Sequence, residues 1–430
     1  MVPVSSPAVP DGAVAVRGGR IAAVGPAREV VAAHPDLAVE DLGDGILTPG
    51  FVDAHCHLEW SLLDGLLPPA PFGPWLGDML ALRLRMGPAD HAAAARSGAL
   101  RALRAGTTTL ADSGPSGQGA AALTALGLRG LVHLEAFGRE EGDAAEAAAA
   151  AYEERLAAVD AAAGPRVRVG VSPHAPYTVG PALWAALRAR RGLAGRPWAT
   201  HVAESAAEEE VIATGHGPLG DLFARAGLTP GDWPGEDGAG VVPRMAAGDA
   251  FAPGLVAAHC VRLRSGDAHI LATAGVSVAH CPRSNIHLRC GRAPLETLRD
   301  AGARVGLGTD SPASGGDYDL RAEARSARDL HAAAGGLTDA ELLRLATAGG
   351  AEALGMAGEV GALAAGLRAD LVALADPGGD GTVEQRAMHP AAAVRMVAVD
   401  GEILLRDGDP EMADGASIDR EAAEARARLC

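Results

Sequence analysis

The stretch VDAHCHLEW, from Val52 to Trp60, places two histidines on either side of one cysteine, directly after apolar residues typical of a buried β-strand. Side chains two residues apart on a strand point to the same face, so His55 and His57 are able to bind one ion together. Cys56 points to the opposite face, and we interpret it as a packing residue. The stretch therefore predicts half of a metal site at the end of a strand.

Outward from this stretch, the chain alternates between strand-like runs and alanine-rich segments typical of helices. Eight strand-like runs follow one another, at residues 46–57, 106–114, 130–138, 166–179, 198–205, 254–261, 276–285 and 304–314. Eight strand–helix units in series are what a (β/α)8 barrel requires, and about 250 residues is its typical size. We therefore predict an α/β fold whose main body is a TIM barrel.

The two chain ends carry a different pattern, of short alternating runs around glycine turns. GAVAVRGGRIAAVG (12–25) and VRMVAVDGEILLRDG (394–408) each predict a hairpin, and DLVALAD (370–376) predicts a further strand. We expect both ends to pair into one small β-sandwich domain. The predicted divisions are 1–48 for its N-terminal part, 49–362 for the barrel, and 363–430 for its C-terminal part with a terminal helix.

Two further expectations concern irregular segments. The Gly- and Pro-rich stretch 229–251, before the sixth strand, predicts a long loop. Because the first hairpin begins close to Met1, either a first strand is missing or the chain starts late.

Composition narrows the function. The 430 residues have a formal net charge of −17, which argues against nucleic acid or an anionic membrane surface as a partner. The sequence shows neither a spanning helix nor a signal peptide, so we expect a cytoplasmic protein with its five cysteines reduced. The chain contains no lysine, which excludes a lysine Schiff base, a phosphate-loop lysine and a carbamylated lysine bridging two metals.

Polar side chains follow the predicted strands at the points where they end: His174, His201, Glu204, His259, His280 and Asp310. In a barrel, active groups lie at the carboxyl ends of strands. His55, His57, His201 and Asp310 together give three imidazoles and a carboxylate, a set that suits zinc or ferrous iron with one open position. With no lysine to bridge a second ion, we expect one divalent ion per chain, Zn²⁺ or Fe²⁺.

The pieces PGFVDAHCH, HVAES, AHC, HCPRSN and GTDSPAS, in this order, resemble the amidohydrolase superfamily, and the resemblance covers nearly the whole chain. It implies a member of the deaminase and chlorohydrolase branch, with one ion held by His55, His57, His201 and Asp310. Glu204 would shuttle a proton, and His259 would orient the hydroxide or polarise the substrate. Asp310 would accept the proton of the attacking water.

The resemblance also suggests a leaving group and a substrate. Chloride leaves without protonation, so Glu204 favours an amine on an aromatic ring. HCHLEW, HVAESAAEEE and HCPRSN are most similar to the 6-aminodeoxyfutalosine deaminases of menaquinone biosynthesis, which is the specific substrate predicted. A deaminase of S-adenosylhomocysteine, methylthioadenosine or adenosine is the alternative, although such proteins more usually have Asn-Pro in place of Cys281–Pro282. Two further alternatives are a triazine-type chlorohydrolase and a non-catalytic assembly protein.

For binding the substrate, a small aminated heterocycle or nucleoside, we predict His174, Glu135, Trp60 and Arg283, the last as partner of a benzoate. Arg289 and Arg292 stay open for that role, and packing is the simpler explanation for Trp60. We also expect the acidic run 208–210 to be a solvated helix face, and a homodimer is possible.

Overall fold

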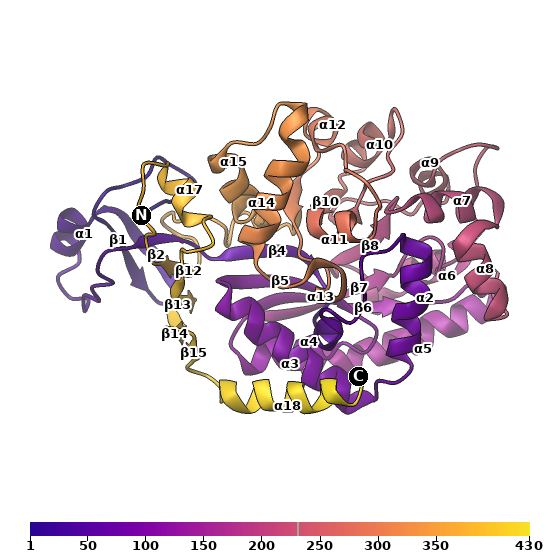
Figure 1. Ribbon diagram of the computed structural model, residues 1–430, viewed down its shortest axis with the longest axis horizontal. Helices are drawn as coiled ribbons and strands as arrows, with labels where there is room; N and C mark the ends of the chain where they lie inside the picture. Colours follow the sequence, from indigo (N-terminus) through magenta and orange to yellow (C-terminus); the bar gives the residue numbers. More distant parts are fainter. Residues whose placement is uncertain (230–231) are drawn as a thin grey trace.

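The structure, a computed structural model, describes residues 1–229 and 232–430, and its main body is a barrel of eight parallel strands (Figure 1). The strands are β4 (Phe51–Cys56), β5 (Thr107–Gly114), β6 (Arg129–Ala136), β7 (Val167–Pro173), β8 (Trp198–Val202), β9 (Leu255–His259), β10 (Ser277–His280) and β11 (Val305–Leu307). Each pairs with the next in chain order, and a bridge between Cys56 and Asp310 closes the ring. The predicted TIM barrel is confirmed.

Helices cover the outside of the barrel and connect its strands. They are α2 (Phe72–Arg83), α3 (Pro88–Arg104), α4 (Gly119–Ala125), α5 (Gly142–Asp160), α6 (Pro181–Ala189), α7 (Ala206–Thr214), α8 (Gly217–Arg225), α9 (Val241–Ala247), α10 (Asp267–Thr273), α11 (Pro282–His287), α12 (Leu295–Asp300), α13 (Pro312–Gly315), α14 (Leu320–His331), α15 (Asp339–Leu345) and α16 (Ala348–Ala353). Val52, Leu131 and Val256 fill the barrel interior, and Leu354 and Met356 pack against them. The interior is therefore a packed core and not a channel.

The first predicted strand, at residues 46–57, divides into two strands that belong to different sheets. β3 (Ile46–Pro49) pairs with β12 (Leu371–Leu374) in an antiparallel sheet, whereas β4 enters the barrel. Gly50 lies at the division, where a Cβ atom would come within 2.1 Å of the Thr108 hydroxyl oxygen. Only glycine fits this crossing, so one continuous apolar run serves both units.

The small β-domain contains strands from both chain ends, as predicted, arranged as two sheets. The larger sheet has the order β15–β14–β13–β12–β3, with β13 (Val394–Val399), β14 (Glu402–Arg406) and β15 (Asp409–Pro410). The N-terminal hairpin, β1 (Gly12–Arg17) and β2 (Arg20–Pro26), forms a separate sheet. The two predicted hairpins therefore share no ladder, and Ile21, Leu371 and Met396 join the sheets in one apolar cluster.

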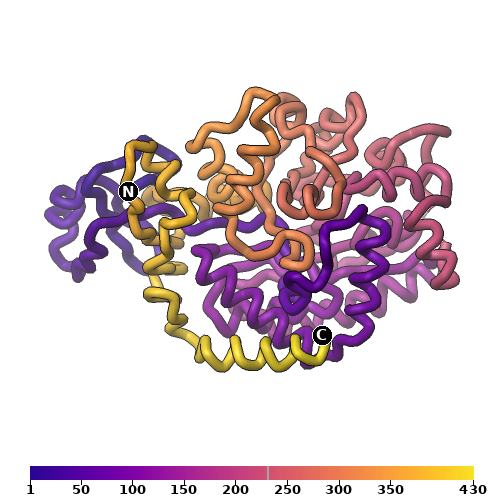
Figure 2. The backbone as a smooth tube through the Cα atoms, in the orientation of Figure 1, coloured from indigo at the N-terminus to yellow at the C-terminus, as the bar shows by residue number. Residues whose placement is uncertain are grey.

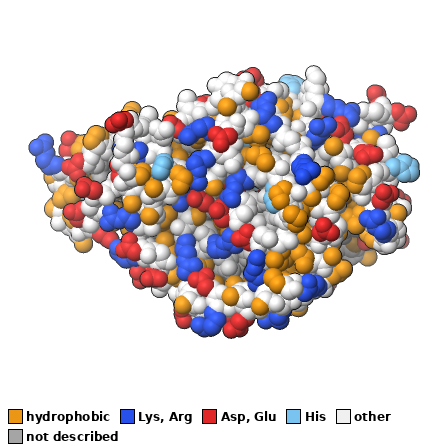
Figure 3. Space-filling model, in the orientation of Figure 1, with side chains coloured by type: hydrophobic (Ala, Val, Ile, Leu, Met, Phe, Trp, Pro, Cys, Tyr) orange, Lys and Arg blue, Asp and Glu red, His pale blue; other side chains and the backbone are white. Residues whose placement is uncertain are grey.

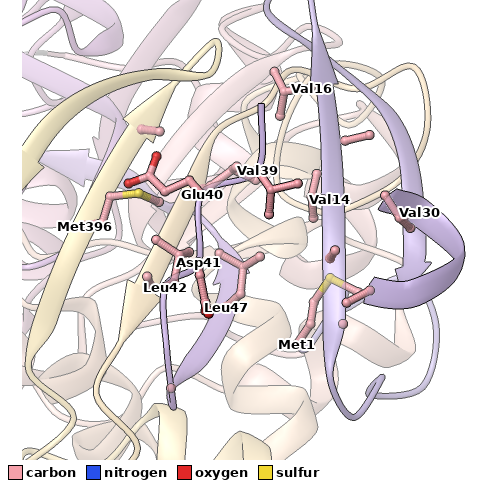
Figure 4. A pocket seen from close by; sticks show the side chains of 18 of the residues that line it. Met1, Val14, Val16, Val30, Val39, Glu40, Asp41, Leu42, Leu47 and Met396 are labelled. Carbon is pink, nitrogen blue, oxygen red and sulfur yellow. The ribbon is translucent and has the colours of Figure 1, made fainter. Parts of the chain in front are cut away.

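A cavity of about 790 Å³ lies in this domain, between the hairpin with α1 (Ala27–Ala33) and the larger sheet. Figure 4 shows Met1, Val14 and Val30 beside the hairpin and α1, with Leu47 and Met396 on the strands of the larger sheet. None of the residues predicted to bind metal or substrate lines this cavity. The candidate site is therefore elsewhere.

Buried ion pairs connect the barrel to the small domain. Arg129, at the start of β6, is 4% exposed and donates to Asp370 at 3.0 Å and to Asp400 at 2.7 Å. Arg166 donates to Asp400 as well, at 2.9 Å. Since each carboxylate depends on a guanidinium from the other unit, these pairs fix how the two units dock.

Arg129→Met is expected to lower the free energy of unfolding by about 3 to 5 kcal/mol, because it leaves the Asp370 carboxylate buried without its main partner. Urea denaturation followed by circular dichroism measures the change. Arg96→Met is the matched control, since Arg96 pairs with Glu421 at the surface and its loss is expected to cost under about 1 kcal/mol. Equal effects of the two variants would contradict the structural role of Arg129.

Two segments complete the fold. α18 (Gly415–Ala427) lies along the barrel beneath α3 (Figure 2), and Asp419 accepts from Arg104 at 2.9 Å. The predicted loop at 229–251 contains α9, and its residues 230 and 231 lie outside the described part.

Among the described residues, no helix is both long and apolar enough to cross a membrane.

Candidate active site

The predicted metal ligands converge at the carboxyl end of the barrel. His55 and His57 come from the end of β4, His201 from β8 and Asp310 from the residues after β11, and all four are buried. His57 Nε2 lies 3.3 Å from His201 Nε2 and 3.5 Å from Asp310 Oδ1. His55 Nε2 lies 4.0 Å from Asp310 Oδ1. Residues far apart in the sequence thus point their donor atoms at one place.

These spacings fit a divalent ion. Tetrahedral zinc with Zn–N bonds of about 2.0 to 2.1 Å requires its ligand atoms to lie roughly 3.3 to 3.4 Å apart. His55 Nε2 is buried and has no hydrogen-bond partner among the described residues. Burial, followed by the neighbouring imidazoles of His57 and His201, lowers the pKa of His55, so this ring is neutral at pH 7 and its lone pair is available.

Backbone carbonyls orient two of these rings. His57 Nδ1 lies 2.8 Å from the carbonyl oxygen of Ser113, and His201 Nδ1 lies 2.7 Å from that of His174. Each Nδ1–H donates to its carbonyl, which leaves the lone pair of Nε2 facing the site. The fold therefore sets the tautomer that a metal ligand needs.

The two carboxyl groups beside the cluster differ in pKa. Burial raises the pKa of Glu204 well above its ordinary value, and the charges of Asp310 and Glu208 act in the same direction. Burial acts on Asp310 too, but the imidazoles of His259 and His57 outweigh it and hold the pKa of Asp310 below its ordinary value. Two neighbouring carboxyls with pKa values moved apart are the arrangement of an acid and a base.

His259, at the end of β9, lies between these two carboxyls. Its Nε2 is 3.7 Å from Glu204 Oε1 and 3.9 Å from Asp310 Oδ2, while its Nδ1 lies 3.0 Å from Asn285 Oδ1. The backbone turns sharply here, with φ of 70° at His259 and 57° at Asp310. Left-handed backbone in non-glycine residues costs about 1 to 3 kcal/mol and is concentrated at functional sites.

The predicted substrate residues have different surroundings. Glu135 and His174 lie beside His201, close enough for their donor atoms to form a group with it. Burial raises the pKa of Glu135 to about 7, and its Oε1 accepts no hydrogen bond from the described residues and lies 3.9 Å from His57 Nδ1. Trp60 is almost fully buried in the main apolar cluster, where it packs edge-on against His91. The substrate contacts of these three residues stay predictions.

Arg283 is placed less favourably for the predicted contact with a substrate carboxylate. Its guanidinium lies 2.5 Å from Asp317 and 3.7 Å from Glu323, so two carboxylates of the protein already neutralise it. Arg292 likewise pairs with Glu296 at 2.8 Å. The sequence places both arginines near the site but does not reveal their partners. Those of Arg283 lie in α14 and just before it, and that of Arg292 lies in α12.

Two polar contacts of the site were not predicted from the sequence. The run 208–210 is expected to be solvated, yet Glu208 is fully buried and accepts from the backbone N–H groups of Ala203 and Glu204 at 3.0 and 2.6 Å. The signal was Ser205 three residues before Glu208, a capping pattern at the start of α7. Ser314, within GTDSPAS, donates to Asp310 Oδ2 at 3.3 Å. Glu208 thus fixes the backbone of Glu204, and Ser314 fixes the carboxylate of Asp310.

A barrel whose carboxyl end joins three imidazoles, a carboxylate and a second carboxyl with a raised pKa is typical of barrel metallohydrolases. The comparisons with known proteins agree. The model of the amidohydrolase family matches residues 46–404, and the chain belongs to this family. A model described as an imidazolonepropionase-like composite domain of bacteria matches residues 12–36, which contain the N-terminal hairpin.

Two relatives carry the name 5-methylthioadenosine/S-adenosylhomocysteine deaminase. The protein of Pelotomaculum thermopropionicum is 36% identical over 84% of this chain and 79% of its own length. That of Moorella thermoacetica is 32% identical over 97% of this chain and 95% of its own length. The predicted class, a hydrolase acting on C–N bonds, is confirmed.

Solved structures agree on the architecture. A zinc-bound adenosine deaminase from Xanthomonas campestris has a TM-score of 0.82 at 27% identity, over 100% of this chain and 96% of that one. The zinc complex of the atrazine chlorohydrolase of Arthrobacter aurescens has a TM-score of 0.76 at 24% identity, over 97% of this chain and 95% of that one. The second likeness shows the fold alone. The adenosine deaminase structure contains zinc, and the donor atoms of His55, His57 and His201 in this chain lie close enough together to hold a divalent ion.

Proposed function

We propose that the protein is a hydrolytic deaminase that removes the 6-amino group from an adenine nucleoside with a substituted 5′ carbon, such as 5′-methylthioadenosine or S-adenosylhomocysteine. The observation that carries the proposal is the pair of carboxyls beside the candidate metal ligands, where the pKa of Glu204 is raised and that of Asp310 is lowered. The names of the relatives support the adenine nucleoside over other aminated rings.

His55, His57, His201 and Asp310 are the residues that would hold one divalent ion, zinc or ferrous iron. Such an ion lowers the pKa of water from 15.7 to about 7, which makes a nucleophile at neutral pH. Zinc is the better supported of the two metals, because the solved adenosine deaminase structure that this chain resembles contains it.

The chain's own residues move the protons. Asp310 Oδ2 accepts the proton of the attacking water, and its lowered pKa keeps it ionised for this purpose. Glu204 Oε1 holds a proton and delivers it to the leaving nitrogen, which cannot depart as an amide anion. His259 Nε2, between the two oxygens, polarises the ring atom that is attacked.

The same acid argues against a chlorohydrolase, because chloride needs no proton to leave. 6-Aminodeoxyfutalosine is the second candidate substrate. This chain has Cys281–Pro282 where deaminases of S-adenosylhomocysteine and adenosine more usually have Asn-Pro, and this difference favours the second candidate. A homodimer, a cytoplasmic location and the three domain divisions stay predictions.

Ammonia release by zinc-loaded protein tests the proposal, with 5′-methylthioadenosine, S-adenosylhomocysteine, adenosine, 6-aminodeoxyfutalosine, guanine and atrazine as substrates. We expect kcat/KM for at least one 5′-substituted adenosine to exceed that for adenosine, guanine and atrazine by 10-fold or more, roughly 1.4 kcal/mol of discrimination. Chloride release from atrazine without deamination of any nucleoside would overturn it. Preference for 6-aminodeoxyfutalosine would select the second candidate.

A further inference from the structure

Arg83, the last residue of α2, lies over the carboxyl end of the barrel between two aromatic rings. Its guanidinium carbon is 5.7 Å from the ring centroid of Trp60 and 5.6 Å from that of Phe137. Trp60 follows β4 and Phe137 follows β6, so both rings are anchored at the end of the barrel that carries the metal cluster. Two cation–π contacts therefore hold this guanidinium in a defined place.

A continuous row of rings connects Arg83 to the candidate metal centre. Phe137 packs at a tilt of 31° on His174, with centroids 4.9 Å apart. His174 is in turn 4.8 Å from the ring of His201. Phe137 is 40% exposed, and Arg83 is half-buried. If one end of a substrate reacts at the candidate metal centre, the substrate can lie along this row of rings. Its other end would then be close to Arg83.

Among the described residues, the guanidinium of Arg83 makes its two cation–π contacts and no side-chain hydrogen bond or ion pair. Arg283 pairs with two carboxylates, and Arg139 donates to the carbonyl of Tyr177 and lies over the ring of Phe223. Arg289 is exposed and, in the described structure, has no aromatic ring to hold it in place. On the face drawn in Figure 3, arginine and acidic side chains are interspersed. Arg96–Glu421 is an example of an exposed ion pair in this protein. The charge of Arg83 acts on the carboxyl of Glu135, but no carboxylate among the described residues pairs with Arg83 directly.

We propose that Arg83 is a specificity-determining residue that binds a carboxylate on the 5′ substituent of the nucleoside, an inference that rests on the proposed function. The two rings offer no acceptor oxygen to the N–H groups of this guanidinium, and the fork of these groups matches the two oxygens of a carboxylate. The rings hold the group in place before binding, which reduces the entropy lost on binding.

A single guanidinium favours a carboxylate over a phosphate dianion. The neighbouring arginine, Arg85, donates to the backbone carbonyl of Arg428 at the surface and has no ring beside it in the described structure. The chain has no lysine to add a second positive charge. S-Adenosylhomocysteine, with an amino-acid carboxylate, and 6-aminodeoxyfutalosine, with a benzoate, both carry the required group, whereas 5′-methylthioadenosine carries none.

The test compares kcat and KM for S-adenosylhomocysteine, 6-aminodeoxyfutalosine and 5′-methylthioadenosine in zinc-loaded wild type, Arg83→Gln, Arg83→Lys and the control Arg85→Gln. We expect Arg83→Gln to lower kcat/KM for a carboxylate-bearing nucleoside about 10- to 100-fold more than for 5′-methylthioadenosine, mainly through KM. Arg83→Lys restores part of the loss, and Arg85→Gln changes the ratio less than about twofold. An equal loss on charged and uncharged nucleosides would show that Arg83 only packs, and would overturn the proposal.

Equilibrium binding separates this proposal from the proposed function. Calorimetric titration of wild type and Arg83→Gln with S-inosylhomocysteine and with 5′-methylthioinosine, the deaminated counterparts, needs no turnover. Weaker binding of the carboxylate-bearing compound to Arg83→Gln alone supports the role of Arg83 even in a protein that deaminates neither nucleoside. Unchanged binding in the variant overturns that role, whatever the activity of the wild type.

Discussion

Glu204→Gln is expected to lower the rate of ammonia release by between about 10²- and 10⁴-fold. The amide has nearly the same shape as the carboxyl group but cannot deliver a proton to the leaving nitrogen. Because Glu204 is not among the four groups that would hold the ion, we expect zinc content and the temperature of unfolding to stay close to those of the wild type. Steady-state kinetics and metal analysis of the same preparation measure both quantities.

The control for Glu204→Gln is Glu209→Gln, which changes a neighbouring acid that pairs at the surface with Arg262 and Arg264. We expect this variant to keep wild-type activity. The pH profile gives a second check on Glu204. Its raised pKa means that the protonated acid is lost as pH rises through that value, so kcat/KM of the wild type should fall on the alkaline side. Full activity of Glu204→Gln would remove Glu204 from the mechanism.

The barrel and its metal cluster were predictable from the sequence for one physical reason. Parallel strands of a barrel all end at one face, so a polar residue at each strand end is placed near the others even when about 250 residues separate them, as with His55 and Asp310. The periodicity of the runs fixes which residues end a strand. The chain therefore encodes this part of the site locally, one strand at a time.

The contacts that were missed depend on which segments pack against each other. Glu208 looks like the start of an acidic run, and only the turn at Ala203 brings two backbone N–H groups to its carboxylate. Arg283 looks like an open cation until α14 supplies Glu323. Gly50 looks like an interruption of one strand, whereas Thr108 makes it the crossing between two sheets. Each outcome depends on a partner that periodicity does not identify.

His55→Ala is expected to have the other large effect, because it removes one of the four groups that would hold the ion. Zinc content should fall well below one ion per chain, and activity should fall by more than about 10⁴-fold, since the nucleophile depends on the ion. We expect the wild-type protein to gain stability from zinc by mass action, about 2.7 kcal/mol when free zinc is about 100 times the dissociation constant, and the variant to gain none. Metal analysis and thermal unfolding with and without added zinc measure both effects.

His269→Ala is the matched control for His55→Ala, because His269 is an exposed histidine on α10 outside the cluster. We expect it to bind zinc and to respond to added zinc as the wild type does. The Nε2 of His55, unpaired within the described part of the chain, makes the comparison informative, since a buried nitrogen with no partner is a cost unless an ion engages it. If His55→Ala retained zinc and activity, the ion would have to bind elsewhere, and the roles derived for Asp310 and Glu204 would be wrong as well.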